Sequence, residues 1–205
     1  MDTLLVARHL AMGASAIPLI GVTDPERFPD PWKALAALPR GAALIWRAYD
    51  TPPDSAALRT LSAAARAKNC LLLVAGYPQA ALWTGTHGLH VPERSLARRY
   101  DNGYLLSLSN LPPGLALTAA CHSEKAILAA SRAGAEAVLI SPVFPTASHP
   151  QADTLGIVRF ARLARIARAH GMTPYALGGI KTSVDVRRLV GSGAAGIAGL
   201  SFLRS

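Results

Sequence analysis

The chain has 205 residues, of which 51% are hydrophobic and 16% are charged, a composition that excludes an intrinsically disordered protein and predicts one compact globular domain. The formal net charge of +9 comes from scattered arginines without interleaved aromatic residues, which argues against nucleic-acid binding and favours phosphorylated metabolites as partners. No hydrophobic run is long enough to cross a membrane, and the start MDTLLVARHLAMGAS favours an amphipathic helix at residues 1–12 over a cleaved signal.

Hydrophobic runs closed by glycine, proline or polar residues alternate with helical segments along the chain. Strands are predicted at 17–23, 42–47, 71–75, 87–91, 115–121, 137–140, 173–177 and 195–200. Helices are predicted at 31–38, 53–68, 78–83, 123–133, 157–170 and 183–190, with Asp54 or Ser55 as the cap of the second. The region 93–113 is ambiguous, with a helical turn expected at 95–100 and either an extra strand or a loop at 104–109.

Eight strands that alternate with helices within this length predict a compact (β/α)₈ TIM barrel over residues 17–205, so that the chain forms a single domain. Only residues 201–205 follow the eighth strand, and the usual eighth helix is therefore expected to be missing. The groove that this helix would cover is expected to be filled by the N-terminal helix, with a homodimer adding cover. Filling by a second subunit alone is the alternative.

The two cysteines, Cys70 and Cys121, lie in hydrophobic strand-like runs without CxxC or Cys/His metal spacing. Both are expected to be reduced core thiols, which fits a cytoplasmic protein. Cys121 stands next to His122, as a nucleophile stands beside its base. Adjacent residues of a strand point to opposite faces, however, and this argues against such a pair.

The segment 115–156 reads as strand, helix, strand, and each strand delivers a polar side chain just beyond its C-terminal end. Parallel barrels bind ligands at this end of their strands, so the site is expected here. His122 is the candidate acid/base group because an imidazole titrates near neutrality. A histidine held structurally at the barrel mouth is the equal alternative. Arg47, at the end of the second strand, is expected to point into the mouth as an anion ligand.

Small residues stand at the ends of the last two strands, with Gly178 and Gly179 after the seventh and Ala198 and Gly199 in the eighth. These two strand ends commonly form a phosphate site in barrels, because glycine lets backbone N–H groups approach the phosphate closely. The sequence therefore favours a phosphate site at these four residues. The alternative is that the glycines only make tight turns.

Five pieces of sequence together resemble the family of thiamine-phosphate synthase and the thiazole tautomerase TenI. They are GLHV at 88–91, HSE at 122–124, AGAEAVLISPVFPT at 133–146, LGGI at 177–180 and GSGAAGIAGLS at 191–201. The resemblance is strong from 115 to 201 and thin before 88. It implies a barrel that binds a small phosphorylated heterocycle, a thiazole phosphate, at the GGI turn and after strand eight. It also implies that Thr146 and the segment 142–146 line the pocket.

The chain departs from the synthase pattern at residues that bind magnesium and pyrophosphate. The strand-two pattern Gln-x-Arg-x-Lys falls on Ile45, Arg47 and Tyr49, so only the arginine is kept. The Asn-Asp after strand three falls on Ala75-Gly76, and the HxGQxD-like pattern falls on residues 90–95, which end in Ser95. The serine before the strand-five histidine is Ala120, and the lysine after PVFPT is replaced near Ser148-His149. Without these carboxylates the charge on the pyrophosphate leaving group is not neutralised.

The TenI branch resembles this chain in its strand-two arginine, its glycine after strand three and its strand-five histidine. Its reaction is a proton shift that aromatises a carboxylated thiazole phosphate, which requires an acid/base group and anion ligands but no metal or other cofactor. The leading hypothesis is therefore a TenI-like tautomerase in which His122 moves the proton and Arg47 holds the carboxylate or positions the ring. The alternatives are a magnesium-dependent thiamine-phosphate synthase and a barrel that binds thiazole or thiamine phosphate without catalysis.

Overall fold

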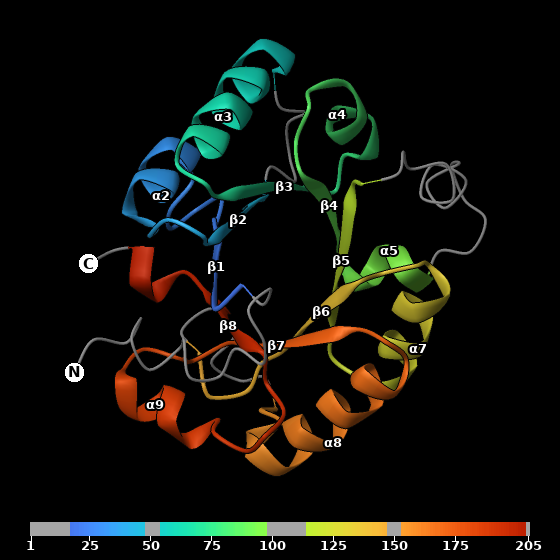
Figure 1. Cartoon of the computed structure of the whole chain (residues 1–205). Helices are drawn as coiled ribbons and strands as arrows, with labels where there is room; N and C mark the ends of the chain where they lie inside the picture. The colour runs from blue at the N-terminus through green and yellow to red at the C-terminus, as the bar shows by residue number, and fades with distance from the viewer. Residues whose placement is uncertain (1–16, 48–53, 98–113, 147–152, 204–205) are drawn as a thin grey trace.

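The computed structural model describes residues 17–47, 54–97, 114–146 and 153–203. Eight parallel strands close into a barrel in sequential order, and the helices lie on its outside (Figure 1). The strands are β1 Leu19–Val22, β2 Ala43–Arg47, β3 Leu71–Ala75, β4 Gly88–Val91, β5 Ala116–Cys121, β6 Ala137–Ile140, β7 Thr173–Leu177 and β8 Gly196–Gly199. The TIM barrel predicted from the strand–helix alternation is confirmed.

The helices connect successive strands. They are α2 Pro31–Ala37, α3 Ser55–Ala67, α4 Pro78–Trp83, α5 Glu93–Ala97, α7 Glu124–Arg132, α8 Gly156–Ala169, α9 Ser183–Arg188 and the 3₁₀ helix η1 Ser201–Leu203. Asp54 caps α3, because its carboxylate accepts the Ala57 N–H at 2.8 Å. α5 begins at Glu93, before the helical turn expected at 95–100. No helix in the described ranges has the length and hydrophobicity needed to cross a membrane.

The predicted helix at 1–12 and the ambiguous strand or loop at 104–109 lie outside the described residues.

Strand residues alternate between the barrel interior and the layer between strands and helices. Ile45, Leu139 and Tyr175 belong to the interior cluster, whereas Leu44 and Ile140 pack in the cluster under the helices. Cys121 also belongs to the outer cluster and is fully buried. Burial, together with the charge of Glu93, raises the pKa of the Cys121 thiol to about 12, so it stays protonated near neutral pH.

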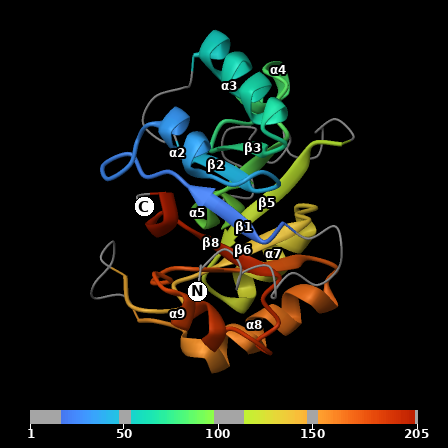
Figure 2. The same ribbon diagram turned by 60° about the vertical axis from the view of Figure 1, so that its left-hand side comes forward.

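In the described part of the chain, no α-helix follows β8. The chain instead enters η1, which packs beside α2 and is the red element near the C-terminal label in Figure 1 and Figure 2. Leu203 of η1 is buried, and a Cβ on Gly21 would lie 3.1 Å from both the Leu203 and the Leu38 side chains. The missing side chain at Gly21 therefore lets η1 and α2 close tightly over β1.

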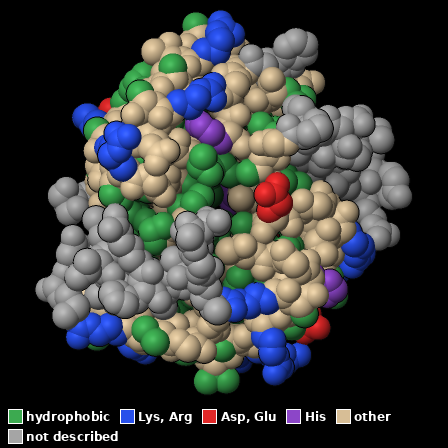
Figure 3. Space-filling model, viewed as in Figure 1, with side chains coloured by type: hydrophobic (Ala, Val, Ile, Leu, Met, Phe, Trp, Pro, Cys, Tyr) green, Lys and Arg blue, Asp and Glu red, His purple; other side chains and the backbone are tan. Residues whose placement is uncertain are grey.

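A cavity of about 490 Å³ opens at the N-terminal ends of the strands, the end of the barrel opposite to the predicted site. Its lining includes Ala43, Ala116 and Ala137, which are the first residues of β2, β5 and β6. Small side chains in this layer leave space that the described residues do not fill, where branched residues are usual. In the space-filling view, hydrophobic side chains surround a central hollow (Figure 3).

Candidate functional site

His122 stands directly after β5 at the C-terminal mouth of the barrel. Its Nδ1 lies 2.7 Å from the Ser141 carbonyl oxygen and 3.2 Å from the Ser141 hydroxyl. A carbonyl oxygen only accepts, so Nδ1 carries a proton and donates it, and this assignment leaves Nε2 as the basic nitrogen of the neutral ring. The side chain is 52% exposed, so a ligand in the mouth can reach it.

Glu93, the first residue of α5, contacts His122 in two ways. Its Oε2 accepts the His122 backbone N–H at 2.7 Å and lies 3.7 Å from the ring Nε2. The two residues come together because β4 and β5 are neighbours in the barrel and α5 begins right after β4. A carboxylate next to the basic nitrogen stabilises the ring when that nitrogen is protonated.

His90 lies inside the barrel on β4, one layer below the mouth. It is 4% exposed, and its Nδ1 is 2.9 Å from the Thr118 hydroxyl on β5. Burial, and to a smaller extent the positive charge of Arg47, lowers the pKa of His90 to about 3. This ring is therefore neutral at pH 7 and adds no charge to the mouth.

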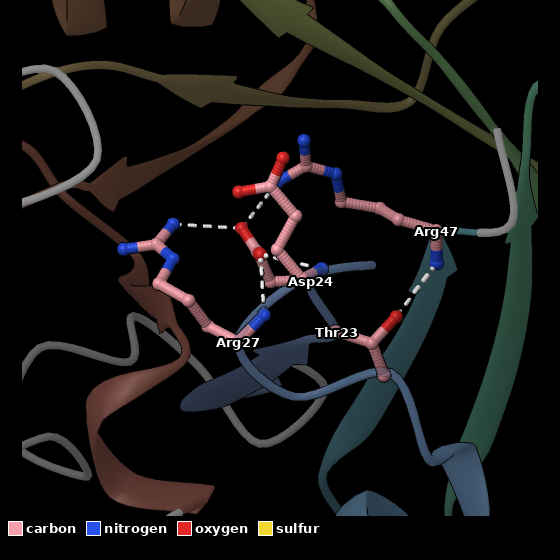
Figure 4. Close-up of polar contacts among 5 residues, drawn as sticks. Thr23, Asp24, Arg27 and Arg47 are labelled. Carbon is pink, nitrogen blue, oxygen red and sulfur yellow. Dashed lines mark hydrogen bonds and ion pairs between the residues drawn. The ribbon is translucent and has the colours of Figure 1, made fainter. Parts of the chain in front are cut away.

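Arg47 ends β2 and belongs to a polar cluster at the mouth (Figure 4). Its backbone N–H donates to the Thr23 hydroxyl at 2.8 Å, and its guanidinium Nη1 lies 3.9 Å from Asp24 Oδ2. The same Oδ2 accepts a hydrogen bond from Arg27 Nη2 at 2.7 Å. Asp24 thus lies between two guanidinium groups, as Figure 4 shows.

Asp24 remains ionised in this cluster. Burial alone would raise its pKa, but the hydrogen bonds and the positive charge of Arg27 outweigh burial and lower it. The negative charge of Glu26 also acts on Arg27 and adds to Asp24 in raising its pKa, so the two guanidinium groups stand beside two carboxylates. A guanidinium such as that of Arg47 can pair with an anionic group through two N–H donors. The Arg47 side chain is 32% exposed, which leaves part of it accessible from solvent.

The glycine turn after β7 packs closely against the segment after β6. Gly178 and Gly179 have φ of 99° and 73°, and Phe144 N–H donates to the Gly178 carbonyl at 3.1 Å. A Cβ on Gly179 would come within 2.6 Å of the Phe144 backbone. Glycine is therefore required here by backbone conformation and by close approach, whatever else the turn does.

The same two strand ends carry backbone donors that are not used within the described ranges of the chain. The N–H groups of Gly178, Gly179 and Ile180 after β7 donate to no described residue, and neither do those of Leu200 and Ser201 after β8. β7 and β8 are adjacent strands of the barrel. Such backbone N–H groups are the donors with which barrels bind phosphate.

Thr146, Ala198 and Gly199 take different places around these donors. Ala198 lies inside β8, is 1% exposed and packs in the barrel interior, so its side chain faces other strands. Gly199 ends β8. Thr146 is partly buried, and a Cβ on Gly178 would lie 3.4 Å from its methyl group.

The residues present do not fit the magnesium site that the synthase pattern implies. Gly76 and Ser95 stand where the pattern has carboxylates, and the described residues contain no group of three His, Cys, Asp or Glu side chains able to hold a metal ion. Tyr49, Ser148 and His149, three other positions in that comparison, lie outside the described residues.

Sequence reasoning did not assign roles to Asp24, Glu93 or Ser141. All three lie one or two residues beyond the C-terminal ends of β1, β4 and β6, and this position is the signal by which they could have been found. Their partners, Arg47 and His122, were selected for the same reason. The sequence does not show how the short connections after these strands turn, and it is this turn that brings the side chains together.

Comparison with known structures supports the fold. Thiamine phosphate pyrophosphorylase from Pyrococcus furiosus superposes with a TM-score of 0.69 at 21% identity, covering 97% of this chain and 96% of that protein. Deoxyribose phosphate aldolase from Aeropyrum pernix superposes with a TM-score of 0.61 at 19% identity, covering 98% and 94%. At these identities the likeness shows a shared barrel fold.

Sequence comparison supports the family. A protein of Aquifex aeolicus named "Putative thiamine-phosphate synthase 2" is 30% identical over 135 residues, a match that spans 64% of this chain and 64% of that protein. The family model described as "Thiamine monophosphate synthase" matches residues 21–203, nearly the whole barrel. The chain therefore belongs to the thiamine monophosphate synthase family.

Proposed function

We propose that this protein is a TenI-like enzyme of thiamine biosynthesis that aromatises a carboxylated thiazole phosphate by a metal-independent proton shift. The observation that carries the proposal is the His122 ring. Its Nδ1 is held by the Ser141 carbonyl at 2.7 Å, and its Nε2 is left as an accessible base at the mouth. A synthase reaction would instead need to neutralise a pyrophosphate leaving group, for which the family's carboxylate positions, Gly76 and Ser95, offer no carboxylate.

The proton shift uses few groups. The basic Nε2 of His122 removes a proton from one ring carbon, and the electron pair of that C–H bond moves into the ring system. The protonated His122 imidazole then returns a proton to a second substrate carbon, which lies outside the thiazole ring. One C–H bond is broken and one is formed, with no net oxidation. Arg47 binds the substrate carboxylate, and the backbone N–H groups after β7 and β8 that donate to no described residue bind its phosphate.

The synthase remains the second candidate, because the family model and the Aquifex relative both carry that name. It predicts release of pyrophosphate from a pyrimidine diphosphate in the presence of magnesium. A barrel that binds a thiazole phosphate without turnover is the third, and ligand-induced thermal stabilisation without product would identify it.

The deciding experiment offers the purified protein both sets of substrates. Tautomerisation is followed by proton NMR of the aromatic product with EDTA present, and pyrophosphate release is followed with magnesium present. We expect turnover in the first assay only. His122→Ala should abolish it, whereas His170→Ala should not, since His170 is an exposed residue at the end of α8. Equal turnover by the His122 variant and the native protein would remove the proposed mechanism.

A further inference from the structure

One carboxylate oxygen of Glu93 lies close to both the backbone and the ring of His122. One oxygen, Glu93 Oε2, is hydrogen-bonded to the His122 backbone N–H at 2.7 Å and lies 3.7 Å from the ring Nε2. The backbone bond anchors the carboxylate beside the nitrogen that the Ser141 contact leaves basic.

We propose that Glu93 is a positioning residue whose negative charge stabilises the protonated His122 ring between the two proton transfers. This inference rests on the proposed tautomerase function. In the neutral ring, only Nδ1 donates, to Ser141. After Nε2 has taken the substrate proton, both ring nitrogens carry protons, and the Glu93 carboxylate already lies 3.7 Å from Nε2 of the charged ring. The interaction is stronger in the charged intermediate than in the ground state, which is the condition for accelerating the reaction.

Within the described ranges, no other carboxylate forms a hydrogen bond or ion pair with His122. Glu124, two residues after His122, is paired with Arg162 at 3.1 Å. The negative charge of Glu93 is also felt by the neighbouring Cys121, where it adds to burial in raising the pKa of the thiol. Among the described residues, Glu93 is therefore the carboxylate that lies within ion-pair distance of this ring.

Glu93→Gln separates the charge from the backbone contact. The glutamine carbonyl still accepts the His122 N–H, so the start of α5 stays in place, but the charge is gone. The side chains of Glu93 and His122 are 31% and 52% exposed, so solvent weakens the attraction between unit charges at this distance. We expect kcat to fall roughly tenfold with KM nearly unchanged. Glu124→Gln, the matched control, should leave both constants within about twofold of the native values.

A double-mutant cycle shows whether Glu93 acts through the ring. In a His122→Asn background, which lacks the group to be stabilised, Glu93→Gln should cause no further loss of the residual rate. A purely structural role predicts a different pattern. Glu93→Gln would then be harmless because it keeps the backbone contact, and Glu93→Ala alone would be impaired. That pattern would overturn the proposal.

A second readout does not depend on turnover. Imidazole ¹⁵N NMR at a fixed pH, with the His122 signals identified by their loss in His122→Asn, reports the proton on each ring nitrogen. We expect Nδ1 to remain protonated in Glu93→Gln, while the Nε2 signal moves toward that of the neutral ring; Glu124→Gln should not change it. An Nε2 signal identical in the native protein and in Glu93→Gln refutes the charge coupling. Absence of native turnover, by contrast, refutes only the proposed function.

Discussion

Replacing His90 by glutamine should make the fold less sensitive to acid. The unfolded His90 ring has the ordinary pKa of 6.5, whereas burial and Arg47 hold the folded value at about 3. Between these values the unfolded chain binds a proton that the folded chain cannot bind. The stability that comes from a neutral His90 is therefore complete above pH 6.5 and is lost as the pH falls through this window.

The magnitude follows from the width of the window. Each pH unit below 6.5 lowers the free energy of unfolding by about 1.4 kcal/mol, so the His90 contribution between pH 7.5 and 4.5 is roughly 2 to 3 kcal/mol. Glutamine is uncharged throughout, and its amide can still bond to Thr118. His90→Gln should therefore lose about 2 to 3 kcal/mol less than the native protein over the same pH change, even if it is less stable at neutral pH.

Urea unfolding followed by circular dichroism at both pH values, for both proteins, gives the four free energies needed. Groups such as Asp24 and Asp185, whose pKa values are lowered in the fold, also reduce stability in acid. Their contribution is present in both proteins and cancels in the comparison. Equal losses of stability in the native protein and in His90→Gln would show that the ring is not buried in its neutral form, and the reasoning would be wrong.

Three further predictions concern the mouth and the core. Gly179→Ala should lower the free energy of unfolding by roughly 2 to 4 kcal/mol, because it combines a positive φ with a Cβ 2.6 Å from the Phe144 backbone. The control Gly41→Ala, with a similar φ and open space around the Cβ, should lower it by about 1 kcal/mol. Comparable urea midpoints for the two variants would contradict this. Arg47→Gln should raise the KM for the carboxylated thiazole phosphate roughly 10- to 100-fold, and an unchanged KM would exclude Arg47 as an anion ligand. Cys121 should resist iodoacetamide at pH 9 until urea unfolds the chain, since its thiol pKa is about 12; mass spectrometry showing rapid native labelling would contradict the burial.

The barrel could be predicted from the sequence because its signals are local. Hydrophobic runs such as 71–75, 137–140 and 173–177 have the length and composition of buried parallel strands, and the structure gives the same bounds. α5 is the element placed differently. It begins at Glu93 because Ser95 N–H already donates to the Pro92 carbonyl, and proline suits the start of a helix. A shift of two residues in this helix decides whether Glu93 belongs to a loop or faces His122.

The candidate site was predictable in part for the same reason. Residues at strand ends, such as Arg47 and His122, must lie at one end of a parallel barrel. The pairings of Asp24 with Arg47 and of Glu93 with His122 depend on how short loops turn after β1 and β4, which no local pattern specifies. The turn at Gly178 and Gly179 illustrates the same limit, because close approach to Phe144 and phosphate binding both require glycine.

The central claim is that His122 moves a proton on a thiazole phosphate without a metal ion. Its most direct test is the rate of aromatisation of the carboxylated thiazole phosphate by purified protein in EDTA, compared with that of His122→Asn. We expect turnover that is insensitive to EDTA and is lost in the variant. Turnover that requires added magnesium, or that persists in His122→Asn, would contradict it.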